Sequence, residues 1–137
     1  MTQSIYPALR YADAHAAIDF LCKAFGFERL AVYESGNTVE HAELALGNSI
    51  IMLGSMRDVG SVHFVTPKEA GGVTGSIYIG IENVDAHHDR AVAAGARVVR
   101  PLTDEDYGSR DYMCLDPEGN VWSFGTYAPQ AQATPRS

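Results

Sequence analysis

The sequence predicts an α+β domain built from two tandem βαβββ modules, which form curved sheets around a cleft. Short motifs recur about 72 residues apart, and both halves of the chain show the same order of strand-like and helix-like patterns. The 137 residues, 46% of them hydrophobic, fit one compact domain with a real core. We expect a single domain over residues 1–127, with module one at about 4–54, a linker at 55–75 and module two at about 76–127.

The internal repeat rests on several matches. Gly26 is matched by Gly95 after 69 residues, so we expect the second helix to be about one turn shorter. The matches at an offset of 72 residues are Asp13-Ala14-His15 with Asp85-Ala86-His87, Gly47-Asn48 with Gly119-Asn120, and Gly36 with Gly108. Agreement at both ends of a segment is much harder to reach by chance than any single match.

Each module is predicted to begin with an extended segment (residues 5–11 and 76–82) and a helix. Asp13 and Asp85 are expected to cap the helices, because a carboxylate accepts hydrogen bonds from first-turn N–H groups. Gly26 and Gly95 suit the left-handed residue that ends a helix. The apolar helical stripes consist of Ile18, Leu21, Cys22 and Phe25 in module one, and of His87, Ala91 and Ala94 in module two.

Three further strands are expected in each module. Gly47-Asn48 is typical of a tight hairpin, and residues 116–120 form a longer turn at the same connection. One such module cannot bury both faces of its sheet, so the two must pair with each other or with a partner chain. The polar tail, residues 128–137, is predicted to be disordered. The predicted strands are 28–34, 39–46 and 48–54, then 97–100, 110–115 and 120–127.

Composition excludes several classes of protein. The net charge of −7 argues against a nucleic-acid surface, and no apolar run approaches the ~20 residues of a membrane span. The N-terminus has neither the basic nor the apolar region of a secretory signal. Cys22 and Cys114 form no CxxC pair and are interpreted as small buried residues in a reducing compartment, so we expect a cytoplasmic protein.

The repeat and two local motifs resemble the vicinal oxygen chelate (glyoxalase/bleomycin resistance protein/dioxygenase) superfamily. The motifs are Asp13, Phe20 and Gly26 in one half, and YGSR (107–110) with DPEGNVW (116–122) in the other. The resemblance covers about residues 4–127 and is nearest to the bleomycin-resistance and PhnB-like branch. It implies paired modules around a cleft and a homodimer. It does not imply one function, because isomerases, dioxygenases and binding proteins share this scaffold.

The resemblance also indicates where metal ligands would lie. They come from the first and last strands of a module, and the last-strand position corresponds to Ser123 and Ile51, with Leu53 as a neighbour. The first-strand residues 6–9 and 76–79 include no His, Glu, Gln or Asp. Because divalent metals need several such ligands, we predict no family-type metal centre and no cofactor.

His41 and Glu43 lie two apart on a predicted strand and therefore share a face. Ala42, Leu44 and Leu46 are interpreted as the helix-packing side, which directs His41 and Glu43 to the cleft or to solvent. In the cleft they could act as a base with its orienting carboxylate, or as part of a relocated metal site. Ordinary solvated strand residues are the alternative.

The remaining candidates are aromatic or charged. Arg110 could recognise a carboxylate or phosphate, with Tyr107 and Tyr112 stacking on the ligand, or it could pair with nearby acids and hold a loop. The repeat aligns Tyr112 with Glu40 on the helix-packing face, which conflicts with a cleft position. Tyr78 and Ser123 are expected to line the cleft, and Trp122 and Phe124 to pack in the core.

The leading hypothesis is a metal-independent small-molecule binding protein whose cleft has aromatic walls and one or two charged anchors. The acidic balance weakly favours cationic aromatic ligands. The alternative is a metal-dependent lyase, isomerase or dioxygenase with a metal relocated to His41 and Glu43. A third hypothesis is an accessory domain that acts through protein contacts. Whether the chain is an enzyme stays open at this point.

Overall fold

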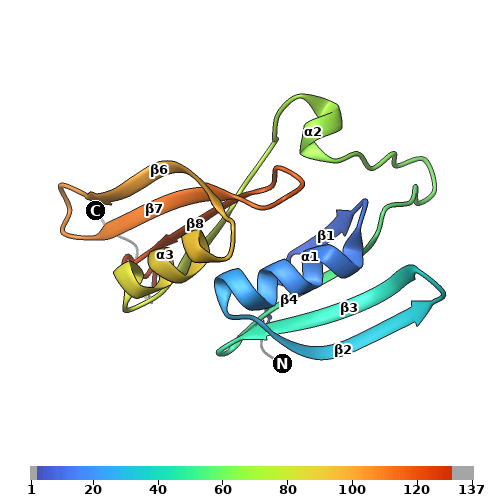
Figure 1. Cartoon of the computed structure of the whole chain (residues 1–137), viewed down its shortest axis with the longest axis horizontal. Coiled ribbons are helices and arrows are strands. Elements are labelled where there is room, and N and C mark those ends of the chain that lie inside the picture. Colours follow the sequence, from blue (N-terminus) through green and yellow to red (C-terminus); the bar gives the residue numbers. More distant parts are fainter. Residues whose placement is uncertain (1–2, 131–137) are drawn as a thin grey trace.

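The computed structural model describes residues 3–130 and consists of two βαβββ modules joined by a long linker (Figure 1). Each module has one four-stranded mixed sheet, with strand orders β1-β4-β3-β2 and β5-β8-β7-β6. The first strand of each sheet runs parallel to the last strand, and the other pairings are antiparallel. The predicted fold class is therefore confirmed.

The elements follow the predicted order. Module one contains β1 (Ala8–Tyr11), α1 (Ala14–Phe20), the π-helical turn η1 (Leu21–Phe25), β2 (Glu28–Ser35), β3 (Thr38–Leu46) and β4 (Ser49–Ser55). The linker, residues 56–76, is called the arch below and includes α2 (Pro67–Ala70). Module two contains β5 (Ile77–Gly80), α3 (Val84–Ala93), β6 (Arg97–Asp104), β7 (Arg110–Leu115) and β8 (Val121–Gly125). The predicted disordered tail lies, from residue 131 onward, outside the described residues.

The two helices begin differently from one another. Asp13 caps α1 as predicted, accepting a hydrogen bond from the Ala16 N–H at 3.0 Å. The predicted Asp85 cap is wrong, because α3 starts earlier and Asn83 caps it by accepting from the Ala86 N–H at 3.2 Å. Asparagine caps a helix as well as aspartate does, and Asp85 is left free for another contact.

A difference in turn length changes the strand register between the modules. Ile51 pairs with Leu44, whereas Trp122 pairs with Cys114, so Trp122 is the counterpart of Ile51. Met52, rather than Ile51, therefore corresponds to Ser123, and both Ile51 and Leu53 are buried on the helix side. Ile51 and Leu53 were expected at or beside the position equivalent to Ser123, and this expectation is wrong. The turn at residues 116–120 shifts the alignment of the two last strands by one residue, and a shift of one residue exchanges the two faces of a strand.

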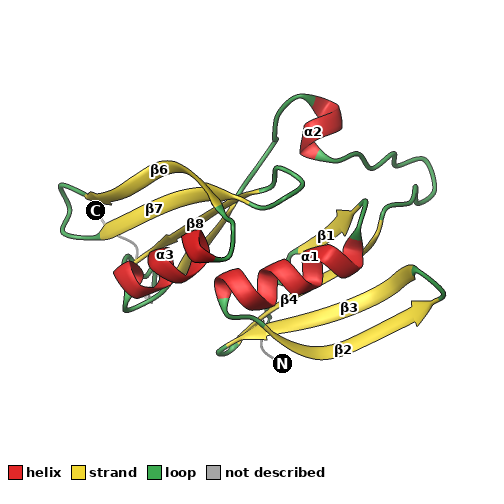
Figure 2. Ribbon diagram, viewed as in Figure 1, coloured by secondary structure: helices red, strands yellow, loops and turns green. Residues whose placement is uncertain are grey.

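The helix-covered faces of the two sheets share one core. The Phe25 ring lies 5.3 Å from that of Trp122 and 4.7 Å from that of Phe124, so the end of η1 packs directly on module two. Trp122 and Phe124 are fully buried, as predicted. Figure 2 shows the α1–η1 helix meeting α3 near the middle of the molecule. The opposite face of each sheet is left without a helix among the described residues.

A buried carboxylate joins the modules at the β7–β8 turn. Asp116, only 4% exposed, accepts hydrogen bonds from Tyr11 Oη at 2.6 Å and from Trp122 Nε1 at 3.1 Å. It also accepts from the backbone N–H groups of Glu118 and Asn120, each at 3.0 Å. The turn thus links the end of β1 to the start of β8. No helix of the described part of the chain is long and apolar enough to cross a membrane.

Replacing Asp116 by alanine is expected to lower the free energy of unfolding by about 2–4 kcal/mol, because the Tyr11 hydroxyl and the Trp122 N–H lose their buried acceptor. Denaturant unfolding measures this change. Asp106→Ala, at an exposed position in the β6–β7 loop, is the control and should shift the value by no more than about 0.5 kcal/mol. Equal effects of the two substitutions would contradict the role given to Asp116.

Candidate ligand-binding site

Four side chains form a row across the open face of the module-two sheet. Tyr78 on β5 pairs with Ser123 on β8, Ser123 pairs with Met113 on β7, and Met113 pairs with Arg100 on β6. Partners in adjacent strands share a face, so these side chains line one surface. A pocket of about 400 Å³ lies over this row. It is lined by Tyr78, Arg100, Tyr107, Asp111, Tyr112, Met113, Ser123, Tyr127 and Pro129.

Three tyrosines form the aromatic wall of this pocket. Tyr107, 68% exposed, meets Tyr127 edge to face with 5.9 Å between ring centroids. The Tyr78 hydroxyl donates to the Tyr127 carbonyl at 2.6 Å. Burial, assisted by the nearby Asp111 carboxylate, raises the pKa of Tyr78, so its hydroxyl stays protonated at neutral pH. The wall therefore offers aromatic faces together with a hydroxyl group.

Arg100 and Asp111 are the charged residues that line the pocket, and Glu105 binds Arg100 beside it. Arg100 Nη1 lies 2.6 Å from Asp111 Oδ1 and 2.9 Å from Glu105 Oε2. The hydrogen bond from Arg100 lowers the pKa of Glu105, whereas burial and the neighbouring Glu105 raise the pKa of Asp111. Because the Arg100 guanidinium is already paired with two carboxylates, it has little remaining capacity to bind an anionic ligand.

Gly125 permits the close approach of Tyr78 to β7. A Cβ atom at this position would lie 2.7 Å from the Asp111 Cβ and 2.8 Å from the Tyr78 hydroxyl oxygen. Both contacts are too short for any side chain, so glycine is required for the two groups to share the pocket floor.

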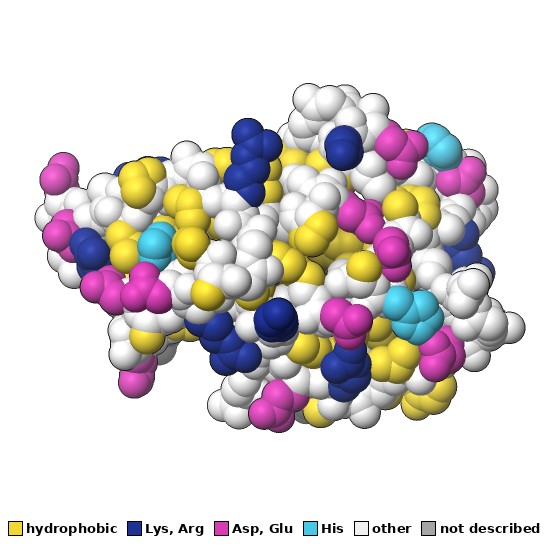
Figure 3. Space-filling model, viewed as in Figure 1, with side chains coloured by type: hydrophobic (Ala, Val, Ile, Leu, Met, Phe, Trp, Pro, Cys, Tyr) yellow, Lys and Arg dark blue, Asp and Glu magenta, His cyan; other side chains and the backbone are white. Residues whose placement is uncertain are grey.

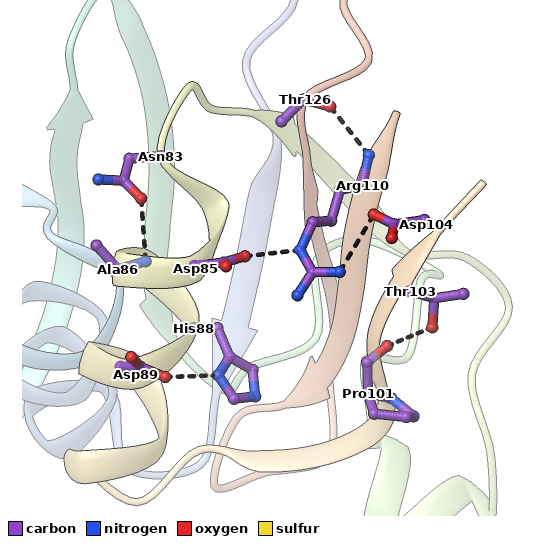
Figure 4. A network of polar contacts seen from close by, with 10 residues as sticks. All are labelled: Asn83, Asp85, Ala86, His88, Asp89, Pro101, Thr103, Asp104, Arg110 and Thr126. Atoms are coloured by element: carbon purple, nitrogen blue, oxygen red, sulfur yellow. Dashed lines mark hydrogen bonds and ion pairs between the residues drawn. The ribbon is translucent and has the colours of Figure 1, made fainter. Parts of the chain in front are cut away.

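Arg110 lies on the helix-covered side of the same sheet, where its guanidinium points toward α3 (Figure 4). Tyr112, two residues along β7, shares that face and contacts His87 of α3. Arg110 Nε is 2.7 Å from Asp85 Oδ1, and Nη1 is 3.2 Å from Asp104 Oδ1. The Tyr112 side chain is buried, 1% exposed, as the repeat alignment indicated. The structure does not bring Arg110 into the pocket, and it places the Tyr112 ring beneath the pocket floor. Arg110 instead ties α3 to β6 and β7.

His41 and Glu43 lie on the open face of the other sheet. His41 Nε2 is 2.9 Å from Glu43 Oε2, and the His41 ring stacks on Tyr33 with 6.2 Å between centroids. Ala42 and Leu44 are fully buried on the opposite face, as predicted. His41 borders a smaller pocket of about 260 Å³, which also includes Arg10 and Met52. This pocket shares no residue with the tyrosine-lined one.

The donor atoms at the family's metal positions do not fit a metal ion. The first and last strands present Ala8 and Met52 in one module, and Tyr78 and Ser123 in the other. Within residues 3–130, no three His, Cys, Asp or Glu side chains lie close enough together to hold a metal. Alanine and methionine supply no hard ligand, and two neutral hydroxyls are weak ones.

A half-buried histidine bridges the two modules on the helix side. His87 Nε2 lies 3.0 Å from the Phe25 carbonyl oxygen, and Nδ1 lies 2.6 Å from the Tyr112 hydroxyl. A carbonyl oxygen can only accept a hydrogen bond, so Nε2 donates to it. Nδ1 of the neutral ring then accepts a hydrogen bond from the Tyr112 hydroxyl. Burial lowers the pKa of His87, which favours this neutral form.

Sequence reasoning placed Tyr78, Tyr107 and Ser123 near a cleft but missed five residues of the pocket. These residues are Arg100, Asp111, Met113, Tyr127 and Pro129. The alternation of Met113 with the buried Tyr112 and Cys114 was a usable signal for its face. Arg100 gave no such signal, because β6 has register irregularities on both sides of it.

Two βαβββ modules with helices on one face of each sheet define a glyoxalase-type fold. The chain belongs to the Glyoxalase/Bleomycin resistance protein/Dioxygenase superfamily, whose family model matches residues 5–124. It is also 36% identical over 126 residues to an uncharacterized protein of Mycobacterium bovis, covering 89% of this chain and 82% of that protein.

Solved structures have a similar fold. TioX from Micromonospora sp. ML1 is 33% identical, with a TM-score of 0.74, covering 90% of this chain and 98% of that one. The fosfomycin resistance protein FosX from Mesorhizobium loti is 13% identical, with a TM-score of 0.64, covering 93% and 94%. The E144Q glyoxalase I mutant from Zea mays is 16% identical, with a TM-score of 0.69, covering 93% and 46%. The last two similarities concern the fold alone.

The free energy of unfolding is expected to fall as the pH drops below about 6.5, by at most about 1.4 kcal/mol per pH unit from His87. The pKa of His87 is lower in the folded chain, so the unfolded chain binds the proton first. The loss levels off once the pH passes the folded pKa. Denaturant unfolding at several pH values measures it.

His87→Gln should remove this part of the pH dependence, because glutamine can donate to the Phe25 carbonyl but does not titrate. His63→Gln, at an exposed position in the arch, is the control and should keep the His87 contribution. An unchanged pH profile in His87→Gln would contradict the assignment of a neutral, half-buried ring.

Proposed function

We propose that this chain is a metal-independent binding protein for small molecules, related to the bleomycin-resistance and PhnB-like branch. The main evidence is the tyrosine-lined pocket, where Tyr78, Tyr107 and Tyr127 surround a floor of Met113 and Ser123. Its volume of about 400 Å³ suits a small organic molecule, and aromatic walls with a few polar groups are typical of such sites.

The charges of the pocket favour a planar cation over an anion. Arg100 is held by two carboxylates, so this cluster carries one excess negative charge when both acids are ionised. Tyrosine faces attract cations through the negative charge of their π-systems. The net charge of −7 on the whole chain acts in the same direction. We therefore propose planar aromatic cations as the ligand class.

We further propose that two copies assemble into a homodimer. Both open sheet faces lack a covering helix among the described residues, and each has a partly apolar pocket. β1 and β5 each form one edge of their sheet, so they are available to a second copy. The module-one face with His41 and Glu43 would then close over the tyrosine-lined pocket of the partner. Two unpaired cysteines, Cys22 and Cys114, support a cytoplasmic location.

A second candidate function rests on the His41–Glu43 pair. A histidine held by a carboxylate beside a pocket is a usable general base, and it could also supply part of a relocated metal site in a lyase, isomerase or dioxygenase. Mass spectrometry of the untagged protein after incubation with Ni²⁺, Zn²⁺, Mn²⁺ and Fe²⁺ tests this candidate. Near-stoichiometric metal that is lost in His41→Ala would favour the enzyme and overturn the binding-protein proposal.

Binding of 9-aminoacridine, a planar cation, tests the proposed ligand class. Tyr107→Ala should weaken its binding about 5–30-fold, because one stacking face worth about 1–2 kcal/mol is lost. Fluorescence titration at low salt measures the dissociation constant. Val92→Ala, at an exposed position on α3, is the control and should leave it unchanged. The proposal fails if 9-aminoacridine does not bind, or if both variants bind it as the wild type does.

Sedimentation velocity tests the homodimer. We expect a species with twice the mass of one chain, and we expect Glu43→Arg to shift the population toward the monomer if this face meets the partner's pocket. Asp89→Arg, at an exposed position on α3 on the helix-covered side, is the matched charge-reversal control. A purely monomeric wild type at micromolar concentration would contradict the assembly.

A further inference from the structure

A second and larger hollow lies where the arch meets the two modules. Its volume is about 640 Å³, and its walls come from α1, the arch, the end of α3, the start of β6 and the β7–β8 turn. We propose that it binds an organic carboxylate with an apolar body. It shares no residue with the tyrosine-lined pocket, so this proposal does not depend on the proposed function.

The walls of the hollow are mainly apolar. Phe20 comes from α1, Val73 from the arch and Ala94 from the end of α3, while Leu115 and Val121 flank the β7–β8 turn. Figure 3 shows hydrophobic side chains between the arch and the body of the molecule, with Lys and Arg side chains beside them. The volume falls within the range of roughly 300–1,000 Å³ that small-molecule sites occupy. The apolar body of a ligand would be buried here.

Two cations give the hollow its chemical preference. Lys68 and Arg97 line it and are exposed, and neither forms an ion pair or a side-chain hydrogen bond within residues 3–130. Most other arginines within the described residues are engaged, as Arg100 and Arg110 are with their carboxylates. An ammonium and a guanidinium with unused donors can together hold one carboxylate.

The two acidic residues of the walls are already satisfied. Asp116 accepts from Tyr11, Trp122 and the backbone of its own turn. Glu118 accepts from the backbone N–H groups of Ala12 and Asp13 at 2.6 and 2.8 Å. The charged groups that retain free hydrogen-bonding capacity in the hollow are therefore both positive. A carboxylate ligand would complement them.

The arch is held in place over the hollow rather than hanging free. Thr66 and Glu69 form a capping box at the start of α2, which orders the segment containing Lys68. The arch also packs closely on the β7–β8 turn, since a Cβ atom at Gly119 would lie 3.3 Å from the Pro67 Cβ. Gly119 also has a φ of +93°, a backbone conformation that favours glycine, so both the close contact and the backbone conformation favour glycine here. Lys68 therefore lies on an ordered segment that forms one wall of the hollow.

Titration calorimetry with decanoate tests the proposal, with decyltrimethylammonium as the cation of matched chain length. We expect decanoate to bind with a stoichiometry of one per chain and the cation to bind at least tenfold more weakly. The double variant Lys68→Glu/Arg97→Glu should weaken decanoate binding at least tenfold. The charge-conserving Lys68→Arg/Arg97→Lys should stay within about threefold of wild type, because both positive charges remain. Both positions are exposed, and a thermal melt of each variant confirms folding.

Two further variants locate the site. Val73→Glu, which places a negative charge in the apolar wall, should weaken decanoate binding at least tenfold, whereas Tyr107→Ala should leave it unchanged. Decanoate that does not bind, that survives the double charge reversal, or that is lost in Tyr107→Ala would overturn the proposal. A charge reversal that changes the sedimentation of the protein, with no effect on decanoate, would overturn it as well and assign the hollow to a contact between copies.

Discussion

The arrangement of both modules depends on the buried carboxylate of Asp116. A buried charge is costly unless donors surround it, and here a tyrosine hydroxyl, an indole N–H and two backbone N–H groups do so. The Tyr11 hydroxyl belongs to module one, whereas Trp122 belongs to module two. The same carboxylate therefore holds the start of β8 against the end of β1.

Both candidate binding regions follow from this junction. With Trp122 bound to Asp116 on the helix side, Ser123 must face the open side, where it joins Tyr78 and Met113 in the tyrosine-lined pocket. The turn that begins at Asp116 also places Gly119 against the arch, which closes the hollow near Lys68. One polar contact thus organises a pocket of acidic character and a hollow with free cations.

Much of the pocket could be predicted from strand alternation, and the rest could not. Tyr78 and Ser123 share a face because their strands pair, and the apolar residues of each strand indicated which face is buried. The sequence did not indicate whether Arg100 or Arg110 faces the pocket. Arg110 is drawn to the helix side by Asp85, which lies on α3, and Arg100 reaches the open face only because β6 changes register around it.

The sequence by itself determined the two modules, the glycine helix ends, the Asp13 cap and the core positions of Trp122 and Phe124, because these depend on local backbone preferences and on periodicity. Tertiary structure decided the rest. Asn83 rather than Asp85 caps α3, Met52 rather than Ile51 matches Ser123, and the arch encloses a hollow. The physical reason is that each of these features depends on contacts between elements that are far apart in the sequence. The length of a turn can change the alignment of two strands by one residue, and such a change moves each side chain to the opposite face of the sheet.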